Sequence, residues 1–79
     1  MRLDKYLKVS RLIKRRTVAN EACDNGLVTV NDKPARASYE VKDGDKISLR
    51  FGARTITVEV VSVQETVRQS EAAAMYRQV

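Results

Sequence analysis

The side chains of this sequence best suited to form a functional site are basic, and they cluster near its start. Between residues 2 and 16 there are seven bases and one acid, Asp4, so this stretch carries +6, whereas residues 17–79 carry −1. A surplus of positive charge confined to one stretch is typical of a surface that binds a polyanion such as RNA. The hydroxyl of Thr17 could add a hydrogen bond to a phosphate. We call the candidate RNA-binding residues the basic segment: Arg2, Lys5, Lys8, Arg11, Lys14, Arg15, Arg16 and Thr17.

Few residues are available for other kinds of site. The chain has no histidine and a single cysteine, Cys23, which excludes a His-based catalytic group, a Cys/His zinc site and an intramolecular disulfide. Asp43 and Asp45 flank Gly44 in a turn, but no third carboxylate follows at the spacing of a calcium loop. There is no Gly-rich phosphate loop and no plausible acid–base pair. We therefore expect no enzyme activity, no metal and no other cofactor.

Length and hydropathy indicate one small domain. Seventy-nine residues leave little room for both a core and a deep catalytic pocket. No apolar run approaches the roughly 20 residues that span a bilayer. The first bases are not followed by the apolar stretch of a signal peptide. We expect a monomer in the cytoplasm.

A first helix is predicted to carry the early part of the basic segment. Leu3, Tyr6 and Leu7 recur at helical spacing, so they mark a buried stripe. Packing is a better interpretation of Tyr6 than stacking on a base. Asp4 lies in the first turn, where the helix dipole favours an acid, and it could pair with Lys8 four residues later.

A second helix is predicted from about residue 14 or 15 to residue 24, where Asn25-Gly26 ends it. Its start coincides with the cluster Lys14-Arg15-Arg16. Free N–H groups at a helix start favour anions, so bases at this position reinforce a phosphate site. The expected buried stripe of this helix is Val18, Ala19, Ala22 and Cys23.

After Gly26 the apolar period changes from 3.6 to 2, which predicts strands. A strand at 27–30 turns at Asn31-Asp32, and Pro34 confines the returning segment to a sheet edge or a loop. The stretch 46–51 alternates, and Gly52-Ala53 can form a two-residue hairpin loop. Counting outward from that loop pairs the following residues: Phe51 with Arg54, Leu49 with Ile56, Ile47 with Val58, and Lys46 with Glu59.

The predicted fold class is α+β, with two N-terminal helices packed on a small, mostly antiparallel sheet. The alternation breaks at Val60-Val61, so we expect a bulge or bend there. The domain is predicted to cover residues 1–63, followed by a tail at 64–79 with a short helix at 70–76. Near the hairpin loop, Arg50 and Arg54 beside Phe51 could form a second basic patch, which Glu59 would partly balance.

Two short helices, the second of which begins with basic residues, also fit a DNA-binding helix-turn-helix protein. That interpretation needs residues that read base edges along the second helix, and only Asn20 is available. A module that works with a separate RNA-modifying enzyme is a further alternative. Binding to RNA, on or off the ribosome, remains the favoured function.

The ordered motifs resemble the S4 RNA-binding domain family over about residues 2–60. They are Arg2-Leu3-Asp4-x-x-Leu7, Arg11, Arg16-x-x-Ala19, Gly26-x-Val28-x-Val30-Asn31 and Val41-x-x-Gly44-Asp45-x-Ile47. Two departures are Arg15, where the family usually has serine, and Asp32, where it usually has glycine. The resemblance implies that two helices, the αL motif, hold structured RNA with their basic face.

The absence of an attached enzyme domain makes the chain similar to short ribosome-associated members of the family. These are heat-shock protein fifteen and the related factors of bacterial ribosome-associated quality control, and the lack of a long basic C-terminal extension favours the latter. The resemblance implies binding to a large ribosomal subunit obstructed by peptidyl-tRNA, with contacts to rRNA and tRNA. It also implies support for alanine tailing of the stalled chain by a separate elongating factor of the quality-control pathway.

Overall fold

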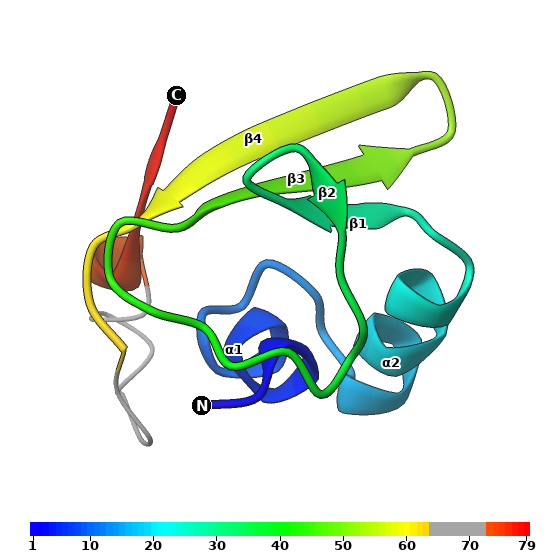
Figure 1. Cartoon of the computed structure of the whole chain (residues 1–79), viewed down its shortest axis with the longest axis horizontal. Helices are drawn as coiled ribbons and strands as arrows, with labels where there is room; N and C mark the ends of the chain where they lie inside the picture. Colours follow the sequence, from blue (N-terminus) through cyan, green and yellow to red (C-terminus); the bar gives the residue numbers. More distant parts are fainter. Residues whose placement is uncertain (64–72) are drawn as a thin grey trace.

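In the residues that the structure describes, 1–63 and 73–79, two short helices pack against one face of a five-stranded antiparallel sheet (Figure 1). The structure is a computed structural model. It confirms the predicted α+β class. The elements in chain order are α1 (Leu3–Val9), α2 (Arg16–Asp24), β1 (Val28–Val30), β2 (Lys33–Pro34), β3 (Lys46–Phe51), β4 (Arg54–Val60), the 3-10 turn η1 (Ala73–Met75) and β5 (Tyr76–Gln78).

The strands lie in the order β2-β1-β3-β4-β5, and every neighbouring pair is antiparallel. The register predicted for the β3–β4 hairpin is confirmed at all four pairs, from Phe51 opposite Arg54 to Lys46 opposite Glu59. Shifting the register by one residue would move the apolar residues of β3 to the wrong face, so the hydrophobic pattern specifies the pairing strongly.

The β1–β2 turn and the sheet edge also follow the prediction. Asn31 and Asp32 both have positive φ, 53° and 68°, as a two-residue type I′ hairpin loop requires. Asn31 compensates for the strained backbone with its side chain, which accepts a hydrogen bond from Lys46 N (3.0 Å). Pro34 lies in β2 at the edge of the sheet, where its missing N–H is not needed.

The core lies between the helix layer and the sheet. Its fully buried side chains include Tyr6 and Leu7 of α1 and Ile47 and Leu49 of β3. Ile56, opposite Leu49 on β4, is half-buried.

From α2, Ala19 and Cys23 enter the core, and burial raises the pKa of the Cys23 thiol to about 11, as suits a packed thiol. The prediction that Val18 is buried is wrong, because its side chain is 47% exposed. The two buried positions are one turn apart, and Val18 is rotated about 100° from Ala19 around the helix, toward solvent.

The C-terminal strand was not predicted from the sequence. Residues 76–78, assigned above to a tail, pair with β4 as β5. Of the short helix expected at 70–76, residues 70–72 lie outside the described part; Ala73–Met75 form one 3-10 turn and Tyr76 begins β5. The Met75 carbonyl accepts hydrogen bonds from Tyr6 Oη (2.7 Å) and from Val61 N (2.8 Å). These bonds tie the end of the chain to α1 and redirect the backbone after Val60, where the alternation breaks.

Candidate nucleic-acid interface

The basic segment covers α1, the connection between the helices and the first turn of α2. Seven of its eight members are exposed, and Lys5 is half-buried. Lys8, Arg11, Lys14 and Arg15 have no ion pair to any other residue in the described part of the chain. Their charges are therefore available to a polyanion.

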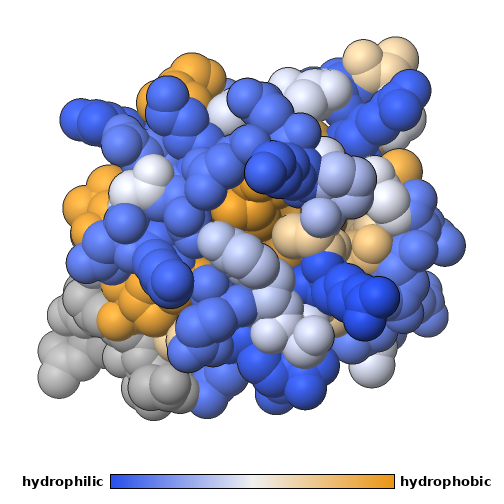
Figure 2. Space-filling model, viewed as in Figure 1, coloured by the Kyte–Doolittle hydropathy of each residue, from blue (hydrophilic) through white to orange (hydrophobic). Residues whose placement is uncertain are grey.

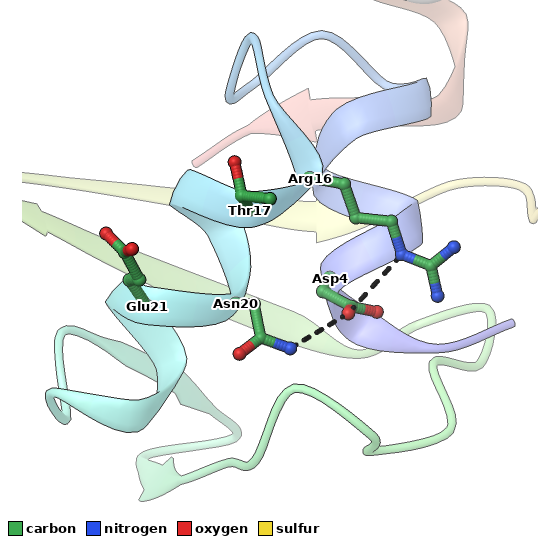
Figure 3. Close-up of a pocket in the computed structure, with 5 residues that line it drawn as sticks. All are labelled: Asp4, Arg16, Thr17, Asn20 and Glu21. Atoms are coloured by element: carbon green, nitrogen blue, oxygen red, sulfur yellow. Dashed lines mark hydrogen bonds and ion pairs between the residues drawn. The ribbon is translucent and has the colours of Figure 1, made fainter.

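Asp4 is buried between the two helices and ties two members of the basic segment together. Its carboxylate accepts a hydrogen bond from Lys5 N (2.8 Å) and pairs with Arg2 Nε (3.2 Å). From α2, Arg16 Nε lies 3.4 Å and Asn20 Nδ2 3.3 Å from the same carboxylate (Figure 3). One buried acid therefore fixes the approach of α2 to α1 and holds two guanidinium groups at their shared edge.

The predicted pairing of Asp4 with Lys8 is wrong, because the partners of Asp4 are Arg2, Arg16 and Asn20. The carboxylate points into the α1–α2 interface, where it is almost completely buried, and Lys8 lies on the exposed face of α1. Arg2 and Arg16 are half-exposed, so each can offer its remaining N–H groups to a phosphate while it stays paired with Asp4. The sequence placed both arginines in the basic segment but did not reveal that Asp4 positions them.

The surroundings of Asp4 lower its pKa. Burial by itself would raise the pKa of this carboxyl, but the hydrogen bonds from Asn20, Arg16 and Lys5 N outweigh burial and hold the pKa below its ordinary value of 3.8. A group whose pKa is lower in the folded state contributes stability above its unfolded-state pKa. That contribution is lost as the pH falls through the folded-state pKa.

Asp4→Asn should therefore lower the free energy of unfolding by about 1–3 kcal/mol at pH 7, because an amide cannot replace the charge-assisted bonds. Urea denaturation of parent and variant at several pH values measures the difference, which should shrink below about pH 4 as the parent's carboxyl is protonated. Asp43→Asn, at an exposed turn position, is the matched control, and its effect should stay below about 0.5 kcal/mol. A difference for Asp4→Asn that persisted unchanged to about pH 2 would show that the charge is not what stabilises the fold.

The start of α2 suits an anion better than the start of α1. The first N–H groups of α1 are occupied, since Leu3 N donates to the Tyr39 carbonyl (2.8 Å) and Asp4 N to the Ala37 carbonyl (3.1 Å). At the start of α2, Arg15 is in the N-cap position with no side-chain cap, and the first turn contains no acid. The helix dipole and the bases at 14–16 therefore act on a phosphate in the same direction.

An open pocket of about 370 Å³ adjoins this start, lined by Asp4, Arg16, Thr17, Asn20 and Glu21 (Figure 3). Thr17 lies on its rim next to the bases, in a position to donate to a phosphate. Glu21, one turn later, would repel one. Anion binding is therefore favoured at the first turn of α2 and not along its whole length.

The described residues provide little for a metal site, a membrane-spanning helix or an apolar protein-binding surface. Within residues 1–63 and 73–79, no three His, Cys, Asp or Glu side chains gather as metal ligands. No helix there is long and apolar enough to cross a bilayer. On the face drawn in Figure 2, hydrophobic side chains show as small patches separated by hydrophilic surface. That face therefore offers no broad apolar area for a protein partner.

The sequence pattern of the S4 domain family matches residues 1–47, which include the whole basic segment. Relatives cover nearly the whole chain. The RQC P-site tRNA stabilizing factor of Halalkalibacterium halodurans is 57% identical over 76 residues, 96% of this chain and 86% of its own length. The protein of the same name from Bacillus subtilis is 53% identical over 76 residues, 96% of this chain and 88% of its own.

Among solved structures, Vibrio cholerae heat shock protein 15 superposes with a TM-score of 0.93 at 32% identity. The match covers 100% of this chain and 81% of that one. That structure is described as trimeric, so it gives no support to the expectation of a monomer.

Proposed function

The chain belongs to the S4 domain family, and we propose that it binds RNA on the large ribosomal subunit and holds P-site tRNA there during ribosome-associated quality control. The observation that carries the proposal is the exposed basic segment on two helices that Asp4 locks together. The names of the relatives, which match 96% of the chain, support the choice of tRNA as the ligand.

The proposed mechanism is electrostatic positioning. Phosphates of one RNA lie at the start of α2, held by the cluster Lys14-Arg15-Arg16 and by Thr17. Exposed bases of α1 and the following connection, Lys8 and Arg11, contact a second RNA segment. Contacts to phosphates fix the position and orientation of an RNA without reading its sequence. A small rigid body that touches rRNA and tRNA together would oppose the movement of one against the other.

The role needs no reaction, so we propose a non-enzymatic factor that acts in the cytoplasm, where ribosomes are. Holding the peptidyl-tRNA would support alanine tailing of the stalled chain, with elongation done by a separate factor. A helix-turn-helix role on DNA is less well supported, because the exposed residues of α2 after its first turn include Glu21 and Asp24, which repel a phosphate backbone.

Sedimentation tests the proposal. The protein should bind large subunits that carry peptidyl-tRNA at least about tenfold more tightly than vacant ones, since one additional charge-assisted phosphate contact is worth about 1.5–3 kcal/mol. Equal binding to the two kinds of subunit would show that the protein does not contact the tRNA. Migration with a separate RNA-modifying enzyme instead of large subunits would favour the enzyme-linked alternative.

A further inference from the structure

We propose that the tip of the β3–β4 hairpin is a second RNA-binding site, in which Phe51 stacks on an unpaired base and Arg50 and Arg54 bind the flanking phosphates. This inference rests on the proposed function and names a contact beyond the basic segment. The chemical class of ligand is a single-stranded or looped stretch of RNA.

The strand register places the ring of Phe51 beside an arginine side chain. Phe51 lies directly opposite Arg54 across the hairpin, so both side chains leave the same face of the sheet. Arg50, one residue earlier, points to the other face, where Thr55 is its partner. The tip therefore presents an aromatic ring with one guanidinium beside it and another behind it.

Phe51 does not act as a core residue, although the alternation places it in line with Ile47 and Leu49. Those two side chains are 0% and 1% exposed, whereas that of Phe51 is 45% exposed. Phe51 therefore lies at the end of the hairpin outside the buried core, which Ile47 and Leu49 of the same strand help to form. An aromatic side chain left half in water gains little from packing, which leaves its ring available to a ligand.

The charge of the tip is not balanced locally. No acid occurs between Lys46 and Val58. Glu59, which we expected to balance part of the patch, forms an ion pair with Arg77 of β5. Glu59 lies five positions along β4 from Arg54, a distance of about 16 Å. Arg50 and Arg54 make no ion pair in the described part of the chain.

An aromatic ring flanked by arginines is an arrangement that binds single-stranded RNA with little sequence preference. Every nucleobase can stack on the ring, and every phosphate can pair with a guanidinium. An acidic protein segment would use the arginines but not the ring. The tip belongs to the sheet layer, whereas the basic segment belongs to the helix layer (Figure 1). The two sites would therefore engage different stretches of RNA.

The sequence permits a direct test, because the chain has no tryptophan. Phe51→Trp places a single indole at the tip, and its fluorescence should be quenched when deproteinised large-subunit rRNA or tRNA is added. Val61→Trp is the matched control, since Val61 is 50% exposed just beyond the other end of β4, and its signal should stay constant. In parallel, Phe51→Ala should weaken binding of these RNAs about tenfold, and Val61→Ala less than about twofold.

Three results would overturn the inference. Unchanged affinity of Phe51→Ala, with no response of Phe51→Trp, would overturn it while leaving the proposed function intact if the parent protein still binds large subunits. A response to intact subunits but not to deproteinised RNA would assign the tip to a ribosomal protein. Failure of the parent to bind any RNA would overturn both the inference and the proposed function. Far-ultraviolet circular dichroism of each variant confirms that an exposed substitution has left the fold unchanged.

Discussion

Replacing both Lys14 and Arg15 by alanine should weaken binding to large ribosomal subunits by about 10²–10⁴-fold. Each charge-assisted contact to a phosphate contributes about 1.5–3 kcal/mol, and two independent contacts contribute about 3–6 kcal/mol. A factor of ten in affinity corresponds to about 1.4 kcal/mol. Both side chains are exposed and have no ion pair in the described part of the chain, so the free energy of unfolding should change by less than about 0.5 kcal/mol.

These two bases separate binding from folding better than Arg2 and Arg16 do. Alanine at Arg2 or Arg16 would also remove a partner of the buried Asp4 carboxylate, so a loss of binding could reflect a loosened helix pair. The matched control is Lys33→Ala with Lys42→Ala, which removes the same charge from exposed positions outside the helices. If the control pair lost as much affinity as the Lys14/Arg15 pair, the basic segment would not be the contact surface.

Leu49→Ala should lower the free energy of unfolding by about 2–5 kcal/mol, a large share of the stability of so small a domain. Leu49 is 1% exposed in the central strand, between Val28 on β1 and Ile56 on β4. Truncation leaves a cavity that a sheet paired on both sides cannot close. Chemical denaturation measures the loss, and Thr55→Ala, at an exposed position of β4, is the control.

The folded fraction of Leu49→Ala should still bind RNA with an affinity within about twofold of the parent, because Leu49 lies in the sheet layer and the basic segment does not include it. Stability within about 0.5 kcal/mol of the parent would mean that the core does not depend on this face of β3.

The parts of the fold that follow from local pattern were predictable. The alternation of 46–51 and the loop Gly52-Ala53 determine the register, and the structure has the predicted pairs. Asn25-Gly26 likewise marks the end of α2, where Gly26 has a φ of 74°. In each case the signal lies within a few residues of the feature that it specifies.

The remaining features depend on contacts between distant residues. Asp4 looks like an ordinary first-turn acid until α2 brings Arg16 and Asn20 to it. Strand β5 forms because β4 has an open edge and because Met75 can reach Tyr6, 69 residues away. The three residues of β5 do not alternate in hydropathy, so the sequence does not predict a strand there. Val18 and Ala19 are neighbours on α2, but only Ala19 faces α1 and the sheet. The composition of the helix does not reveal which of the two apolar residues is buried.

The salt dependence of binding to large subunits tests most directly the central claim that the basic segment neutralises RNA phosphates. With about four phosphates neutralised, the logarithm of affinity should fall against the logarithm of salt with a slope of roughly −3 to −4. The Lys14→Ala/Arg15→Ala variant, which contacts two phosphates fewer, should give a slope of about −1 to −2. A slope near zero for the parent, or the same slope for parent and variant, would contradict the claim.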